Sequence, residues 1–432
     1  MRTRAYKENV AFATALGARV RKRTLCSTDC SGFKKGYMCV TMGKEIKASY
    51  YDNFACVADR CSLTCCQEWK IAVDDKTYDK WKRLTPPESV KTKNETLDAF
   101  VQMKDGERVI CLEENQKCPF LNCDKLCKLV TVYGDSVLSE TCQIFPREIH
   151  EFEDRKEYTL MPCCPEALEL LYQQEKFEVV TVDALERSEE TQQCLRLLRD
   201  KMISYVQRED VAVEESLLVL FYLLLDLWEQ CGEIEEEKEK LLVTSKMLQE
   251  ITEAVANVEL PMEYTFEERN ELFLDLSVNY RREGLYKEFL EPLAEEAEWI
   301  SKRFSEQGEL AWKSDLQEKV TEFENHMKKY NGFMKRFLAS EIFADVLGED
   351  GDLESMVVKF QWLSLEYAVI RQALFLHWLK RKDLQFEDLR DYMAVVCRMT
   401  GYEDDDIYEY LENSFESLVW DWGYFALIIG KV

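Results

Sequence analysis

Apolar residues recur at three- and four-residue spacing from about residue 168 to the end of the chain. Stripes of this kind predict amphipathic helices that bury one face. Two of them are Leu195, Leu198, Met202 and Tyr205, and Leu272, Leu276 and Tyr280. Only Pro261 and Pro292 interrupt this part of the chain. We therefore expect a mainly α protein whose residues 168–432 form a helical domain.

Two segments, residues 217–225 and 367–379, are apolar on nearly every side. The first is nine residues long before Asp226, and a bilayer requires about 20 apolar residues. Both segments are therefore predicted to be buried core helices. We expect a cytoplasmic protein with no membrane partner.

A different pattern precedes the helical domain. Residues 148–152 and 157–161 alternate in polarity, and the polar segment 153–156 lies between them. Alternation with a period of two predicts strands, so these segments are expected to form a short β-hairpin. Such a hairpin would bring Cys142 and Cys164 together.

The charge of the chain is uneven. Residues 1–41 carry a net charge of +7, whereas the whole chain carries −27. We expect this basic extension to be disordered, or to be an over-long start. The acidic remainder argues against a nucleic-acid partner, because phosphate binding requires a positive surface. It fits either a basic protein partner or a helical protein kept soluble by its charge.

Cysteine is concentrated in the first part of the chain: fourteen of the seventeen cysteines lie between Cys26 and Cys164. Disulfides at this density belong to small secreted domains, and no apolar run of signal-peptide length occurs near the start. Metal binding is the better interpretation. Residues 42–167 are therefore expected to form a cysteine-rich, metal-binding module that includes the hairpin.

The first cysteine array places four thiols within eleven residues: Cys56, Cys61, Cys65 and Cys66. If residues 61–70 were helical, Cys61 and Cys65 would project from one face. Clustered thiolates bind zinc or an iron–sulfur cluster. The alternative is that one or two of these thiols are simply buried.

The second array carries a family resemblance. Its motifs are Cys118-Pro119-Phe120-Leu121, Leu126-Cys127, Leu138-Ser139-Glu140-Thr141-Cys142 with Phe145-Pro146-Arg147, and Cys164-Pro165-Glu166-Ala167. Together with an opening motif that runs from Tyr51 to Trp69, they resemble the flagellin lysine N-methylase family of the FliB type. The segment 330–337 is similar to an aromatic and basic segment of that family. The cysteine spacing also resembles that of cysteine-rich zinc or iron chelator proteins.

The resemblance implies methyl transfer from S-adenosylmethionine to lysine ε-amino groups of flagellin, with a 4Fe-4S cluster. The metal ligands that it implies are Cys56, Cys61, Cys65, Cys66, Cys111, Cys118, Cys127, Cys142 and Cys164. Cys123 and Cys163 depart from the family pattern and are excluded as essential ligands.

The residues themselves do not identify the chemistry. Gly-x-Gly, typical of a cofactor turn, is absent from the chain, and Cys65 is followed directly by Cys66 instead of the Cys-x2-Cys spacing of a radical enzyme. No general base is named, and His150 and His377 are expected to be packed residues. The alternative function is a non-catalytic adaptor or chelator that binds zinc or iron.

Overall fold

The computed structural model describes residues 44–90, 92–104, 106–182, 190–230, 245–306, 309–348, 351–402, 404–416 and 420–430. The basic extension predicted over residues 1–41 lies outside these ranges. Helices are the main element of the described chain, which confirms the expected mainly α class. None of the helices in these ranges is both long and apolar enough to cross a membrane.

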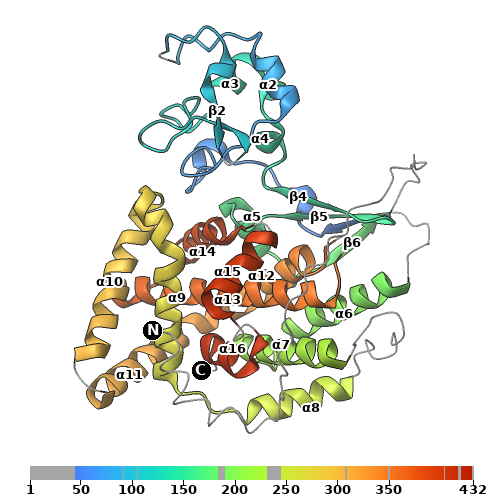
Figure 1. Ribbon diagram of the computed structural model, residues 1–432, viewed down its shortest axis with the longest axis vertical. Coiled ribbons are helices and arrows are strands. Elements are labelled where there is room, and N and C mark those ends of the chain that lie inside the picture. The colour runs from blue at the N-terminus through green and yellow to red at the C-terminus, as the bar shows by residue number, and fades with distance from the viewer. Residues whose placement is uncertain are drawn as a thin grey trace.

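A large helical body occupies the second part of the chain (Figure 1). Its helices are α5 (Pro165–Tyr172), α6 (Glu190–Val206), α7 (Val213–Gln230), α8 (Ser245–Ala256), α9 (Met262–Glu283), α10 (Lys287–Glu306), α11 (Glu309–Met327), α12 (Asn331–Asp345), α13 (Leu353–Arg381), α14 (Phe386–Thr400), α15 (Asp404–Phe415) and α16 (Trp422–Ile429). Helix α13 packs against α7, α9, α10, α12 and α14, so it is the central helix of this body.

The two apolar segments that the sequence singles out lie inside α7 and α13, and most of their side chains are buried. Helix α13 starts with a capping box, in which the Asp352 carboxylate accepts from the Ser355 amide at 2.8 Å. It ends at Lys382, whose left-handed φ of 56° stops the helix. Burial on all sides explains why this helix lacks a polar face.

A four-stranded sheet covers one end of the helical body. Its order is β4 (Arg147–Glu151), β5 (Arg155–Leu160), β1 (Lys44–Ala48) and β6 (Val179–Val182). Strands β4 and β5 pair antiparallel, with His150 opposite Glu157. Strand β1 pairs parallel with β5 and antiparallel with β6, so the sheet takes strands from both sides of residue 167.

A smaller lobe stands above β4 and β5 in Figure 1 and has its own apolar core. It contains α2 (Asp75–Trp81), β2 (Val101–Lys104), β3 (Glu107–Ile110), α3 (Lys128–Tyr133) and α4 (Glu140–Ile144). Trp81 is 1% exposed, stacks edge-on against Phe120, and donates from Nε1 to the Val137 carbonyl at 2.8 Å. The lobe therefore closes around an aromatic centre of its own.

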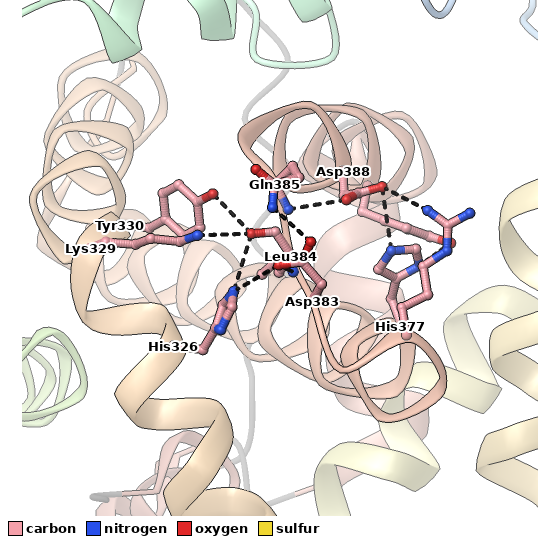
Figure 2. Close-up of polar contacts among 10 residues, drawn as sticks. His326, Lys329, Tyr330, His377, Asp383, Leu384, Gln385 and Asp388 are labelled. Atoms are coloured by element: carbon pink, nitrogen blue, oxygen red, sulfur yellow. Dashed lines mark hydrogen bonds and ion pairs between the residues drawn. The ribbon is translucent and has the colours of Figure 1, made fainter.

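The aromatic and basic segment 330–337 fastens helices to one another. Figure 2 shows the Leu384 carbonyl, between α13 and α14, accepting from Tyr330 Oη at 3.0 Å, Lys329 Nζ at 3.1 Å and His326 at 3.3 Å. Farther along α12, Arg336 donates to three carbonyls at and just after the end of α5. These contacts join neighbouring helices through backbone carbonyls, so the segment has a structural role.

Candidate functional site

The cysteine loops of the small lobe are joined through their backbones. The Cys118 amide donates to the Cys66 carbonyl at 2.8 Å, and Leu121 forms an isolated bridge with Cys127. Cys142 lies on α4, whose first turn is capped by the Ser139 hydroxyl. The charges of Cys65 and Cys127 reach the Cys142 thiol, so three segments that are distant in sequence meet at one place.

Residues 61–70 do not form the helix that was considered from the sequence. The segment consists of turns, and Glu68 has a left-handed φ of 55°. The physical reason is that its polar groups bond outside the segment: the Glu68 amide donates to the Gln116 carbonyl at 2.7 Å and its carboxylate accepts from the Tyr286 amide at 2.9 Å. Cys61 and Cys65 are therefore placed by turns and not by one helix face.

The structure gathers seven of the nine predicted ligands, all of them at least partly buried, close enough for their charges to interact. The pKa of the Cys118 thiol is raised to about 12, chiefly by burial, with smaller contributions from the charges of Cys127, Cys142 and Cys65. Burial also raises the pKa of Cys164 to about 12, with smaller contributions from Cys61 and Cys65. The seven, named here the thiol cluster, are Cys61, Cys65, Cys66, Cys118, Cys127, Cys142 and Cys164.

Four other cysteines that were predicted or excluded as ligands lie outside the thiol cluster. Cys56 is exposed, although its charge reaches Cys61. Cys111 and Cys123 are exposed, and Cys163 is buried beside Cys164. In the described part of the chain no three cysteine sulfurs lie within 4.8 Å of one another. A tetrahedral zinc site with Zn–S bonds of about 2.3 Å would bring its sulfurs to about 3.8 Å, so the thiol cluster is more open than such a site.

Arg398 of α14 joins the thiol cluster to the helical body. Its guanidinium donates to the carbonyls of Cys163 at 3.0 Å, Leu63 at 3.0 Å and Thr64 at 3.3 Å, and the side chain is 6% exposed. It also lies 5.4 Å from the centre of the Trp69 ring. The positive charge opposes the effect of burial on the pKa of the Cys61, Cys65 and Cys163 thiols. Arg398 therefore favours negative charge at the thiol cluster.

Four acidic side chains and one histidine form a group next to Cys163, on strand β4 and helices α12 and α13. We name it the acidic row: Glu148 and His150 on β4, Glu341 and Asp345 on α12, and Glu366 on α13. Burial raises the pKa of Glu341 well above its usual range, and the charges of Asp345, Glu366 and Glu148 add to this effect. Charges of Glu148 and Glu341 also reach the Cys163 thiol. The acidic row therefore lies next to Cys163, whose neighbour Cys164 belongs to the thiol cluster.

Two histidines have the packed positions expected from the sequence. His377 Nδ1 lies 3.0 Å from Tyr392 Oη inside the helical body, and burial lowers the pKa of its imidazole. His150 is half-buried on β4, 3.4 Å from Glu148 Oε1. Burial lowers the pKa of His150, but the hydrogen bond and charge of Glu148 outweigh it and leave the pKa raised.

Arg398, Glu341, Asp345 and Glu366 were not predicted as site residues from the sequence. Local spacing carried a weak signal, because Glu341 and Asp345 are four apart on a helix and Glu148 and His150 are two apart on a strand. Nothing in those spacings indicates that the helix and the strand would meet.

Comparison with known proteins decides the family. The sequence profile of the FliB lysine N-methylase C-terminal domain matches residues 199–428, just over half of the chain. The chain belongs to the FliB lysine N-methylase family. The matched region contains Arg398 and the α12 and α13 members of the acidic row, whereas all of the FliB-type cysteine motifs precede it.

Three Salmonella proteins show a partial similarity to this FliB family member. The flagellar biosynthetic protein FliU of Salmonella muenchen is 29% identical over 139 residues, which cover 28% of this chain and 75% of that protein. Proteins named lysine-N-methylase from Salmonella typhimurium and Salmonella choleraesuis are 28% and 27% identical over 139 residues, covering 28% of this chain and 32% of each relative. The alignment thus spans about a third of those two methylases. No solved structure matches the chain.

Proposed function

We propose that this chain transfers methyl groups from S-adenosylmethionine to lysine ε-amino groups of flagellin, and that an iron–sulfur cluster takes part. The observation that carries the proposal is the FliB lysine N-methylase match over residues 199–428. Two relatives bear the name lysine-N-methylase, and a third is named for flagellar biosynthesis. The net charge of −27 suits a substrate recognised through exposed lysines.

The donor set fits an iron–sulfur cluster. Thiolates are the usual ligands of such clusters, and the thiol cluster offers seven sulfurs on backbone loops that are hydrogen-bonded to one another. Arg398 supplies a buried positive charge that compensates cluster and thiolate charge. When bound, the cluster would supply electron transfer and a site for S-adenosylmethionine. The best candidate ligands of the iron–sulfur cluster are Cys65 and Cys118, which lie at the centre of the thiol cluster.

The first test measures metal, sulfide and activity on the full chain purified without oxygen. About four irons and four acid-labile sulfides per chain are expected for a 4Fe-4S cluster. Isotope-labelled S-adenosylmethionine should then place label on flagellin, and mass spectrometry should locate it on lysine. One or two zinc ions without sulfide, and no label on flagellin, would instead support the zinc-binding adaptor.

A matched pair of variants separates ligands from bystanders. Cys65→Ser removes a member of the thiol cluster, whereas Cys123→Ser changes an exposed cysteine of the same lobe. We expect Cys65→Ser to lower iron content at least several-fold and Cys123→Ser to leave it unchanged. Equal iron content in the two variants would contradict the assignment of the thiol cluster as the metal centre.

A further inference from the structure

Three potential metal ligands of the acidic row converge at one point. Glu148 and His150 project from the same face of β4 because they are two residues apart, and Asp345 is the last residue of α12. One carboxylate oxygen of each acid and one imidazole nitrogen all lie within 4.8 Å of one another. Among the described residues, this is the only set of three potential metal ligands that lie so close together, and none of the three is a cysteine.

A third acid, Glu341, lies near these ligands without a partner among the described residues. Glu341 lies one helical turn before Asp345, on the same face of α12. Its side chain is 5% exposed, and no residue of the described chain makes a hydrogen bond or ion pair with its carboxylate. An ionised carboxylate buried in this way costs several kcal/mol of free energy unless a cation is near. Without a cation Glu341 keeps its proton, in agreement with its raised pKa, and a cation bound beside it would favour the ionised carboxylate.

The neighbouring cationic side chains already have partners. The positive charge of Lys359 lowers the pKa of Asp345, but the Lys359 ammonium lies 2.9 Å from the Asp404 carboxylate. Arg155 pairs with Glu157, and Arg147 donates to the Phe54 carbonyl. His150 can carry one charge, and it faces at least three acids.

We propose that Glu148, His150 and Asp345 bind a divalent transition-metal ion at a second site, separate from the thiol cluster. One imidazole nitrogen with carboxylate oxygens suits Mn²⁺, Fe²⁺ or Zn²⁺. Asp345 is exposed, which leaves an entry path for the ion, and Glu341 lies behind the site where its charge would balance that of the metal. This inference does not depend on the proposed methyl transfer, because it concerns binding alone.

The test uses Mn²⁺ on the full chain with its thiol cluster as purified. Mn²⁺ prefers oxygen and nitrogen donors to thiolates, so it separates this site from the cysteines. Binding during the titration is monitored through the loss of the electron paramagnetic resonance signal of free Mn²⁺. Pulsed spectra should show coupling of the bound ion to a histidine nitrogen. We expect one Mn²⁺ per chain.

Variants assign the ligands. Asp345→Asn and His150→Ala should each weaken Mn²⁺ binding at least tenfold, and His150→Ala should also remove the nitrogen coupling. Glu151→Gln is the matched control, because Glu151 is an exposed acid on the opposite face of β4. Asp345→Asn changes an exposed side chain, so it keeps the test decisive if His150→Ala fails to fold.

Three results would overturn the proposal. The first is a wild-type chain that leaves all Mn²⁺ free in solution. The second is unchanged affinity in Asp345→Asn. The third is that the chain binds a lysine peptide but not Mn²⁺, and that Asp345→Asn weakens the peptide binding. The acidic row would then be a receptor for an ammonium group.

Discussion

The Nε atom of Arg398 donates a hydrogen bond to the backbone carbonyl of Cys163, at 3.0 Å and across 235 positions of sequence. The same guanidinium reaches the carbonyls of Leu63 and Thr64. One side chain of α14 thus holds two loops that carry members of the thiol cluster. The region matched by the FliB profile and the cysteine motifs that precede it are therefore physically connected through Arg398.

Replacing this arginine should loosen the connection. Arg398→Met removes a donor from three carbonyls, and an unsatisfied buried group costs about 1–3 kcal/mol. We expect a loss of about 3 kcal/mol in the free energy of unfolding, measured with urea, and a partial recovery in Arg398→Lys. Arg381→Met is the control, since that side chain is 66% exposed. A melting curve for Arg398→Met that overlays the wild type would refute the bridging role.

The second prediction concerns a buried ion pair between α6 and the sheet. The two terminal guanidinium nitrogens of Arg199 donate to Glu157, at 2.7 and 2.8 Å, and both side chains are 2% exposed. Arg199→Met should cost about 3 kcal/mol because it leaves a buried charge short of a partner. Lys246→Met, which removes an exposed pair with Glu250, should cost less than about 0.5 kcal/mol. Equal losses in a denaturant titration would contradict this ranking.

The third prediction is a pH dependence from Glu366. Burial raises the pKa of its carboxyl above the ordinary 4.5, although hydrogen bonds from Thr400 and Cys397 oppose this. The folded state therefore keeps a proton that the unfolded state releases, and this contribution to stability falls as the pH rises from about 4.5 through the raised pKa.

Glu366→Gln removes that titration. We expect the melting temperature of the variant to decline less than that of the wild type between pH 4 and pH 8. Glu412→Gln, a change at an exposed acid, should keep the wild-type profile. Parallel profiles for Glu366→Gln and the wild type would show that Glu366 titrates normally in the folded protein.

The fourth prediction concerns the end of α16. Gly430 has a left-handed φ of 66°, and an added Cβ would overlap Thr265 Cγ2 and lie 2.9 Å from Arg269 Nη2. Gly430→Ala should cost about 2–4 kcal/mol, from backbone strain and from overpacking together. Gly284→Ala has a similar φ of 73° but open space around it, so it should cost only about 1 kcal/mol. Thermal unfolding of the two variants side by side tests whether the close contact matters.

Much of the helical body could be predicted from local pattern. Stripes such as Leu195 to Tyr205 lie on helices, and the apolar segments 217–225 and 367–379 are buried in α7 and α13. Local spacing suffices here because a helix presents residues three and four apart on one face. The cysteine arrays also stood out in the sequence, since short spacings between thiols rarely serve packing alone.

Contacts between distant segments could not be predicted in the same way. A periodic stripe states which face is buried but not what covers it, so the parallel pairing of β1 with β5 had no local signal. The same holds for Asp345 beside His150 and for Arg398 beneath Cys163. Residues 61–70 illustrate the cause: their backbone bonds to Gln116 and their Glu68 carboxylate bonds to Tyr286. The sequence by itself determined the helices and the supply of thiols, whereas tertiary hydrogen bonds decided which of them meet.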